Sequence, residues 1–380
     1  MVKKYSILFV FVIFLFSCNQ NYDKKTSEKD IKYIPTLIEY ANNFSIKKAE
    51  NYTILEVLNP WQDADNVKYT YYLSSQKKEN LPKNLKYIQT PVKKVVCLST
   101  THIGFLDLIE KTNTIIGVSG ANFIYNPKVQ KRIETNKVFD VGYEQNLNIE
   151  LIISLKPDVV FVYGIQGNIA NKISELEKLG INVVIIAEYL EENPLGKAEW
   201  LKFFAEFYEQ EEVAKKFFNE ISKNYQKLSK KLDTIKEKTG VLVNIPYQGV
   251  WYIPGGNSYF AKLISDAGGN YLWKENQKNE SYPISFEAVF AKQKEADILI
   301  NPSSVGSIEE LLQVETRLSH FDCVKNKEVY NNNLRTNKNG GNDFWESAVV
   351  KPDLVLKDLI TIFYPEIFNP DSLYYYQKLN

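Results

Sequence analysis

The sequence NIELIISLKPDVV, residues 148–160, joins the start of a helix to the start of an apolar strand. Residues 285–299, SFEAVFAKQKEADIL, have the same arrangement. In each stretch a good N-cap residue, Asn148 or Ser285, is followed two positions later by Glu, and an Asp then opens an apolar run. The repeat predicts two similar lobes, each with a helix that leads into a strand of a buried sheet.

Short β-branched runs alternate with helical segments around these two stretches. The runs have the composition of strands that are buried on both faces of a parallel sheet. Strands are predicted at residues 95–98, 114–118, 158–162, 182–186, 241–245 and 298–301. Helices are predicted at residues 101–110, 148–155, 168–179, 258–267, 285–292 and 347–362. This alternation predicts an α/β fold with mostly parallel, helix-covered sheets.

One long helix is predicted between the two α/β regions. Residues 211–237 contain no Gly or Pro, and their apolar residues recur at steps of three and four. At the usual rise per residue such a helix is roughly 40 Å long. We expect it to be a rigid connector between the lobes.

An additional segment, residues 31–90, precedes the first lobe. Apolar residues recur at helical spacing between Ile34 and Ala41, and two β-rich runs, residues 52–58 and 67–73, flank a turn. We expect a helix and a hairpin that pack on lobe 1. The predicted organisation is a signal peptide at 1–17, a tether at 18–30, an N-terminal extension at 31–90, lobe 1 at 91–196, a connecting helical region at 197–238 and lobe 2 at 239–380.

The composition limits the classes of function. The chain has 380 residues with 46 Lys and Arg and 46 Asp and Glu, so no cationic excess is present to bind nucleic acid. Its two His and three Cys lack the spacing of a metal site, and there is no phosphate-binding glycine motif. A hydrolase that uses Ser99 or Ser119 with His102 is an alternative, but no acid is indicated to orient the His. We expect a binding protein with no catalytic or metal-ligating residue and no intrinsic cofactor. Cys97 and Cys323 either form a disulfide or, as we favour, are buried free thiols.

The N-terminus has the features of an export signal. Lys3 and Lys4 precede an apolar run at residues 7–16, which is shorter than the ~20 residues that a membrane-spanning helix needs. The ending at Ser17-Cys18 resembles a bacterial lipobox, which implies that Cys18 is lipidated. The alternative is an ordinary signal peptide with a chance Cys. We expect a protein that is lipid-anchored at the periplasmic face of a bacterial membrane.

Several motifs then follow one another in order over residues 91–362. They are DVG at 140–142, NIELI at 148–152, LKPDVV at 155–160, LEKLGI at 176–181, the helix at 211–237, DAGGN at 266–270 and KNKEVY at 325–330. In this order they resemble the metal-chelate-type substrate-binding proteins of ABC importers for iron–siderophores, haem and cobalamin. The resemblance implies a periplasmic-binding-protein-like fold with one backbone helix and a monomeric lipoprotein. It also implies an ABC permease dimer with its cytoplasmic ATPase as partner. Compact members of the family lack residues 31–90.

Glu150 and Glu287 have two interpretations. An anion in the first turn of a helix offsets the positive end of the helix dipole by roughly 0.3–1 kcal/mol, which explains each Glu separately. The resemblance implies instead that these Glu residues, one on each lobe, dock into Arg-lined pockets of the permease. We favour docking, because a carboxylate on each lobe would pair directionally with Arg.

Ligand-binding residues are expected just past the strands, because ligands of open α/β sheets lie outside the carboxyl ends of the strands. The residues at these places are Ser99, Thr100, Thr101, Tyr163, Glu188, Tyr189, Tyr247 and Ser303. Aromatic residues in turn-rich loops suit a large, flat ligand, although each could equally belong to a core. The predicted ligand-binding residues are Tyr163, Trp251, Tyr252, Trp345, Phe344, Tyr189, Thr100 and Arg335, the last being either a ligand contact or an ordinary surface cation.

The cargo that the resemblance implies is a metal chelate in the cleft between the lobes. Ferric siderophore leads, cobalamin follows because Arg is scarce, and haem is third because His is nearly absent. Two alternatives come from other classes: a lipoprotein hydrolase, and a surface capture module in which residues 31–90 bind a protein.

Overall fold

The computed structural model describes residues 33–76, 86–143, 146–164, 169–232, 235–369 and 372–380. Ile34–Asn380 form one compact unit. The predicted signal peptide at 1–17, the whole tether at 18–30 with Cys18, and residues 31 and 32 of the predicted extension lie outside the described residues. No helix in the described ranges is both long enough and apolar enough to cross a membrane.

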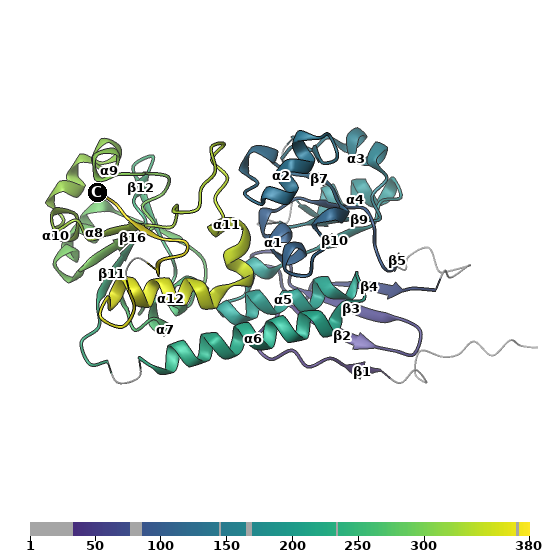
Figure 1. The fold of residues 1–380 in the computed structure, drawn as a ribbon, viewed down its shortest axis with the longest axis horizontal. Coiled ribbons are helices and arrows are strands. Elements are labelled where there is room, and N and C mark those ends of the chain that lie inside the picture. The colour runs from purple at the N-terminus through teal and green to yellow at the C-terminus, as the bar shows by residue number, and fades with distance from the viewer. Residues whose placement is uncertain (1–32, 77–85, 144–145, 165–168, 233–234, 370–371) are drawn as a thin grey trace, which may run out of the picture. The chain divides into compact units, whose positions relative to one another are not determined.

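Lobe 1, on the right of Figure 1, is built on a parallel sheet of five strands. Their order is β10-β9-β6-β7-β8. The strands are β6 (Val95–Cys97), β7 (Ile115–Val118), β8 (Phe139–Asp140), β9 (Val159–Val162) and β10 (Val183–Ile185). The helices are α1 (Thr100–Leu108), α2 (Pro127–Glu134), α3 (Ile149–Leu155) and α4 (Ile169–Lys178). Asn148 caps α3 by accepting a hydrogen bond from the Leu151 N–H at 2.9 Å. The predicted helix and strand of residues 148–160 are therefore confirmed.

Lobe 2 is built on a second five-stranded sheet, in the order β14-β11-β16-β17-β18. Its strands are β11 (Gly240–Val243), β14 (Asn270–Tyr271), β16 (Ile298–Ile300) and β17 (Val329–Asn331), which are parallel, and the antiparallel edge strand β18 (Gln377–Lys378). A smaller antiparallel sheet contains β12 (Pro246–Tyr247), β13 (Val250–Ile253) and β15 (Tyr282–Ile284). The helices are α7 (Tyr259–Asp266), α8 (Phe286–Ala291), α9 (Ile308–Val314), α10 (Asp322–Lys325), α11 (Phe344–Ser347) and α12 (Pro352–Phe363).

Short 3₁₀ segments complete the two lobes. They are η2 (Thr112–Thr114), η3 (Ala121–Phe123), η5 (Glu188–Leu190), η6 (Gln293–Glu295), η7 (Thr316–His320) and η8 (Ala348–Val350). Cys97 and Cys323 are both buried and free, so the expectation of buried thiols is confirmed.

Two helices, α5 (Pro194–Glu206) and α6 (Glu211–Lys230), connect the lobes. Ala214 of α6 belongs to the core of lobe 1, whereas Ile221 and Tyr225 of the same helix belong to the core of lobe 2. One helix therefore packs into both cores, as expected of a connector. The predicted length was wrong: α6 has 20 residues and is about 30 Å long. The helix ends at Lys230 because the N–H groups of residues 231 and 232 bond to carbonyls three residues earlier instead of four. Leu232 then packs in the core of lobe 2.

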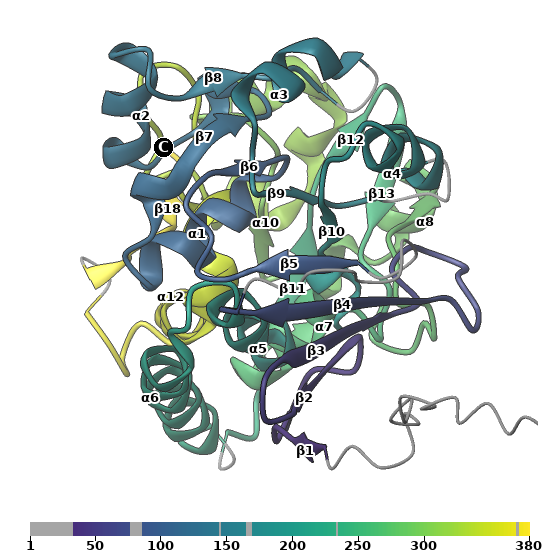
Figure 2. The ribbon, with the colours of Figure 1, turned by 90° about the vertical axis from the view of Figure 1, so that its right-hand side faces the viewer.

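The N-terminal extension is a sheet in the order β1-β2-β3-β4-β5. Its strands are β1 (Ile34–Pro35), β2 (Phe44–Lys48), β3 (Thr53–Leu58), β4 (Lys68–Ser74) and β5 (Tyr87–Gln89). The predicted hairpin is confirmed, since β3 and β4 pair antiparallel. Figure 2 shows this sheet below the strands of lobe 1. Its apolar face shares one core with α5, where Phe44 packs 4.8 Å from Trp200 between ring centroids.

The predicted helix between Ile34 and Ala41 is wrong. β1 is followed by irregular chain, and Ile34 and Leu37 are 65% and 72% exposed. The N–H groups that a helix would use internally are taken by two buried carboxylates of the connecting region. Glu199 accepts hydrogen bonds from residues 39–41, and Glu191 accepts them from residues 42 and 43.

Candidate functional site

A cavity of about 260 Å³ lies between elements of lobe 1, lobe 2 and α5. Its lining residues are Ser99, Thr101, Tyr163, Glu188, Tyr189, Pro194, Lys197, Tyr259, Leu263, Phe344, Trp345, Ala348, Val349, Pro352 and Val355. Apolar and aromatic side chains dominate this lining. Pockets that bind drug-sized ligands usually have volumes of about 300–1,000 Å³, so this cavity is slightly smaller than that range.

The lobe 1 wall comes from the carboxyl ends of neighbouring parallel strands. Ser99 and Thr101 follow β6, Tyr163 follows β9, and Glu188 and Tyr189 follow β10. Because these three strands are adjacent in the sheet, their ends meet at one edge. The rule that placed ligand residues just past strands therefore identified this wall from the sequence.

The lobe 2 wall consists of helix residues. Phe344 and Trp345 lie on α11, Pro352 and Val355 on α12, and Tyr259 with Leu263 on α7. Trp345 is 56% exposed, whereas Phe344 is buried beneath it with 5.0 Å between the ring centroids. The structure thus leaves the indole at the cavity with its ring available for stacking.

Two opposite charges interrupt the apolar lining. Glu188 is 3% exposed, and its Oε1 accepts a hydrogen bond from Thr101 Oγ1 at 2.6 Å. Lys197, on α5, places its Nζ 4.0 Å from the centroid of the Tyr259 ring. Burial holds the pKa of Lys197 below its ordinary value, although the carboxylates of Glu188 and Glu191 act in the opposite direction.

Two predicted ligand residues lie away from the cavity. Trp251 is 1% exposed and packs in the core of lobe 2 near Phe286 and Phe321, where its Nε1 donates to the Val243 carbonyl at 3.1 Å. Tyr252, the next residue of β13, is 46% exposed on the other face of that strand. Alternation along a strand explains both positions, and the local sequence pattern does not set which face of this strand is buried.

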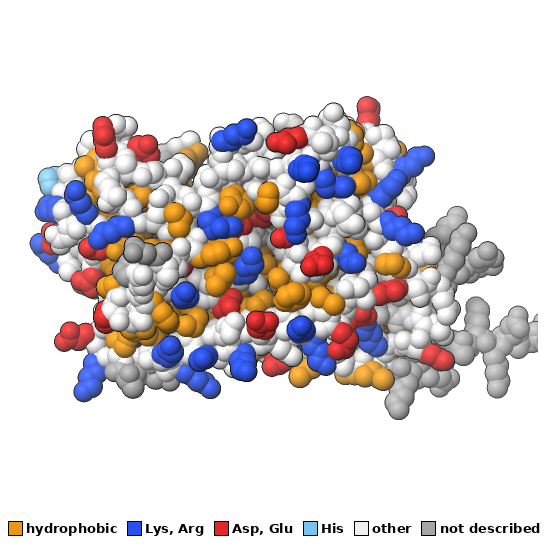
Figure 3. Space-filling model, viewed as in Figure 1, with side chains coloured by type: hydrophobic (Ala, Val, Ile, Leu, Met, Phe, Trp, Pro, Cys, Tyr) orange, Lys and Arg blue, Asp and Glu red, His pale blue; other side chains and the backbone are white. Residues whose placement is uncertain are grey.

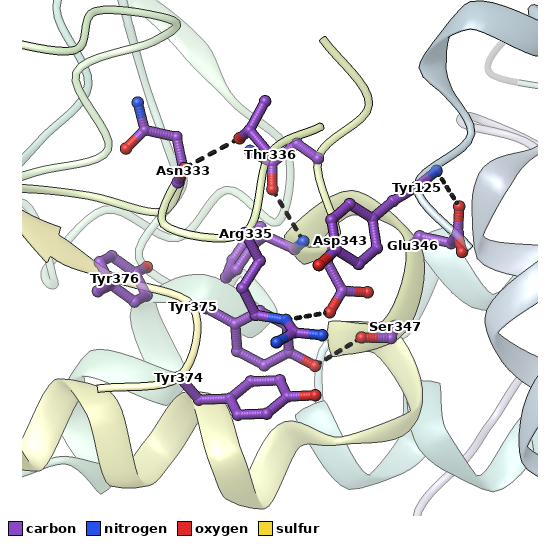
Figure 4. A network of polar contacts seen from close by, with 12 residues as sticks. Tyr125, Asn333, Arg335, Thr336, Asp343, Glu346, Ser347, Tyr374, Tyr375 and Tyr376 are labelled. Carbon is purple, nitrogen blue, oxygen red and sulfur yellow. Dashed lines mark hydrogen bonds and ion pairs between the residues drawn. The ribbon is translucent and has the colours of Figure 1, made fainter. Parts of the chain in front are cut away.

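Arg335 also lies outside the cavity lining, in a network near the border of the lobes (Figure 4). Its Nε donates to Asp343 Oδ2 at 2.6 Å, and its guanidinium lies 4.3 Å from the centroid of the Tyr374 ring and 5.3 Å from that of Tyr125. Thr100 is close to the site without lining it, because its Oγ1 donates to the Trp345 carbonyl at 2.8 Å. Both residues therefore hold the border together.

The cavity residues on α5 and α7 had no signal in the sequence analysis. Lys197, Tyr259 and Leu263 lie in helices, so the rule that ligand residues follow strand ends does not predict them. Asn193 caps α5 by accepting from the Leu195 N–H, which fixes the start of that helix. Such a cap is readable in a sequence, but the face that α5 turns to the cavity is set by tertiary packing.

Glu150 and Glu287 occupy corresponding positions in α3 and α8. Each lies in the first turn of its helix and is exposed. Each also follows an N-cap residue whose side chain accepts a hydrogen bond from a backbone N–H group. The Glu287 side chain is 79% exposed, with Arg317 Nη1 at 3.8 Å from its Oε1. Figure 3 shows cationic and anionic side chains interspersed on the viewed face, with apolar side chains near its middle.

Within the residues that the structure describes, His102 forms no dyad of the kind that the alternative hydrolase would need. His102 is fully buried between Phe161 and Phe204, and neither ring nitrogen has a hydrogen-bond partner among the described residues. Burial lowers its pKa to about 3. Ser99 Oγ lies 2.8 Å from Thr101 Oγ1 instead of bonding to a His. In the described part of the chain, no group of three or more His, Cys, Asp or Glu is placed to hold a metal ion.

Comparisons with known proteins agree with this architecture. Residues 95–333 match the family model described as periplasmic binding protein. An uncharacterised lipoprotein of Methanocaldococcus jannaschii is 31% identical over 376 residues, covering 92% of this chain and 87% of the relative.

Solved structures with similar folds include two periplasmic proteins. One is a haem-binding protein of Pseudomonas aeruginosa, with a TM-score of 0.55 and 16% identity over 72% of this chain and 93% of that chain. The other is a solute-binding protein of Staphylococcus epidermidis, with a TM-score of 0.54 and 21% identity over 72% of this chain and 100% of that chain. At these identities the likeness concerns the fold.

Proposed function

The chain belongs to the periplasmic binding protein family, and we propose that it is the substrate-binding lipoprotein of an ABC importer. In this proposal it acts as a monomer that takes up a small-molecule cargo outside the cytoplasm and delivers it to a permease dimer. The cavity between the two α/β sheets is the observation that carries the proposal. Its lobe 1 wall lies at the carboxyl ends of parallel strands, where such sheets bind ligands.

The proposed cargo is a metal chelate, with ferric siderophore as the leading class. Tyr163, Phe344 and Trp345 give a wide contact area at little cost in side-chain entropy, which suits a large and semi-rigid molecule. Cobalamin is the second class. Haem is the third class. Tyr189 has a hydroxyl oxygen at the cavity that is of the type that ligates haem iron, but this hydroxyl already donates a hydrogen bond to the Gly164 carbonyl.

A binding titration tests this assignment. Full-length protein in detergent is titrated with a ferric siderophore, cobalamin and haem, and tryptophan fluorescence is followed. We expect saturable quenching by at least one of them, with a matching mass increase in native mass spectrometry. Absence of binding to all three would contradict a metal-chelate cargo.

For delivery we propose that Glu150 and Glu287 contact the permease. Their support is their exposure and their matching places in α3 and α8, one in each lobe. An Arg of a partner can pair with a carboxylate in a bidentate way, and two such anchors would fix the orientation of both lobes. The contact between Glu287 and Arg317 at 3.8 Å is long and exposed, so exchanging it for a partner Arg costs little.

An uptake assay separates delivery from capture. The double variant Glu150→Ala with Glu287→Ala is expected to bind cargo normally and to lose most uptake by cells. The matched control replaces Glu134 and Glu309 by Ala, because both are exposed helix carboxylates and Glu309 also lies in a first turn. Equal uptake by the two double variants would contradict the docking role.

The same proposal places the protein at the outer face of a membrane through lipid on Cys18. The lipobox-like ending Ser17-Cys18 supports it, as does the lipoprotein relative that spans nearly the whole chain. Metabolic labelling with a fatty-acid probe tests it directly. Cys18→Ala is expected to lose the label and to release the protein from membranes.

A further inference from the structure

Glu188 holds an unused hydrogen-bond acceptor in the cavity. Its side chain is buried, Oε1 is bonded to Thr101, and Oε2 has no hydrogen-bond partner within the described ranges of the chain. Leaving a buried acceptor unpaired costs about 1–3 kcal/mol, and more for a charged group. Glu188 lines the cavity, so a bound molecule would bring a hydrogen-bond donor toward this carboxylate, whose Oε2 itself has almost no exposed surface.

Lys197 holds unused donors in the same cavity. Its Nζ faces the ring of Tyr259 at 4.0 Å, and no oxygen of the described residues accepts a hydrogen bond from it. An aromatic face attracts the positive charge but leaves the N–H donors of an ammonium group without strong acceptors. An oxygen of a bound molecule would satisfy them.

Both groups are fixed in place before a ligand arrives. Thr101 Oγ1 bonds to Glu188 and lies 2.8 Å from Ser99 Oγ, so the two hydroxyls hold the carboxylate in one orientation. Lys197 Nζ lies over the Tyr259 ring, and this cation–π contact favours one position of the ammonium group. The two charges also cancel, so the polar part of this cavity has no net charge to neutralise. Binding groups that are positioned in advance lose little entropy when they meet a ligand.

Building on the proposed function, we infer that the cavity selects a chelate through an uncharged edge that donates one hydrogen bond and accepts another, as a carboxamide does. The amide N–H would donate to Glu188 Oε2, and the amide oxygen would accept from Lys197 Nζ. An anionic edge would satisfy Lys197 but repel Glu188, and a cationic edge would do the reverse. The surrounding apolar walls increase both penalties, because charges are weakly screened there.

Three probes test this selectivity in a calorimetric titration. They are cyanocobalamin, which has peripheral carboxamides, a ferric trihydroxamate that contains secondary amides, and a ferric tris-catecholate trianion. The variants are Glu188→Gln and Lys197→Met, which keep the approximate size of each side chain. Glu220→Gln and Lys223→Met, on the exposed face of α6, are the matched controls.

We expect the wild type to bind an amide-bearing probe at least about tenfold more tightly than the trianion. A loss of about tenfold in affinity is what one mismatched charged contact is expected to cause. Glu188→Gln should weaken the amide-bearing probe and strengthen the trianion, because it leaves the cavity positive. Lys197→Met should weaken the binding of the amide-bearing probe and of the trianion. If Glu188 had a merely structural role, Glu188→Gln would not change the affinities of the amide-bearing probe and the trianion in opposite directions.

Three results would overturn the inference. They are tighter binding of the trianion by the wild type, equal weakening of all probes by Glu188→Gln, and variants that behave like the α6 controls. In each of these cases chelates still bind, so the proposed function survives. If no probe binds the wild type, the proposed metal-chelate cargo fails first and the inference fails with it.

Discussion

Tyr125 of lobe 1 donates its backbone N–H to Glu346 Oε2 of lobe 2 at 2.8 Å. The carboxylate is 2% exposed, and it lies beside Trp345, whose carbonyl accepts from Thr100 of lobe 1. Asn337 adds a third bond between the lobes through its Nδ2 and the Ile124 carbonyl at 2.8 Å. Three hydrogen bonds therefore connect helix α11, which carries the exposed indole, and the loop before it to lobe 1.

The Glu346 carboxylate makes stability depend on pH. Burial first, and then the charges of Asp343 and Asp107, raise its pKa to about 8, against the backbone N–H groups of Tyr125 and Asn126, which lower it. A carboxyl with a raised folded pKa stabilises the fold most below its unfolded pKa, and this stability is lost as the pH rises through the folded pKa.

We therefore expect the free energy of unfolding to fall by about 1 kcal/mol or more between about pH 6.5 and 8.5. Glu346→Gln should remove most of this slope while keeping an oxygen acceptor for Tyr125. Glu206, whose burial raises its pKa to about 7, leaves a residual slope in the variant. Urea denaturation at several pH values measures the free energy of unfolding. An equal pH dependence in the wild type and in Glu346→Gln would contradict the role of Glu346.

Gly104 of α1 lies against the backbone of Glu346 in α11. A Cβ at this position would lie 2.2 Å from the Glu346 carbonyl oxygen, which is backbone and cannot rotate away. Gly104→Ala is expected to lower the free energy of unfolding by about 1–3 kcal/mol through overpacking. Gly306→Ala is the control, since its nearest atom is the end of the Glu310 side chain at 3.4 Å. Similar urea midpoints for the two variants would show that the helix shifts without cost.

Glu199 fastens the extension to the connecting helix α5. Besides the N–H groups of residues 39–41, it accepts from Lys202 Nζ at 2.7 Å, and it is fully buried. Glu199→Ala leaves these donors without their acceptor, so we expect a loss of about 3–5 kcal/mol. Amide hydrogen exchange should then speed up first in residues 36–58. Glu220→Ala, an exposed change on α6, should leave the free energy of unfolding and the exchange rates unchanged. If the amides of the extension stay protected from exchange in Glu199→Ala, Glu199 does not hold the extension in place.

Local sequence signals were enough for much of the fold because they act within a few residues. N-caps such as Asn148 and Ser285 and apolar β-branched runs such as β9 place helices and strands without reference to distant contacts. The failures needed distant partners. The segment before Phe44 avoids a helix because Glu199 and Glu191, far along the chain, take its N–H groups.

The site divides in the same way. Residues past strands, such as Tyr163 and Glu188, follow from topology, because parallel strands end at one edge. Trp251 and Tyr252 could not be told apart without the register of β13, which buries the first and exposes the second. Lys197 and Tyr259 meet only through the packing of α5 against α7, which no local pattern encodes.

Trp345 is expected to report cargo binding by its fluorescence. It is 56% exposed at the cavity, whereas Trp200 and Trp251 are at most 1% exposed in two separate cores. Acrylamide should therefore quench Trp345 first in the free protein, and bound cargo should shield it. Trp345→Phe is expected to remove most of the fluorescence change on titration with a metal chelate, and Trp251→Phe is expected to keep it. If the change instead disappears with Trp251→Phe and persists with Trp345→Phe, the ligand lies against the β12-β13-β15 sheet and the cavity between the lobes is not the binding site.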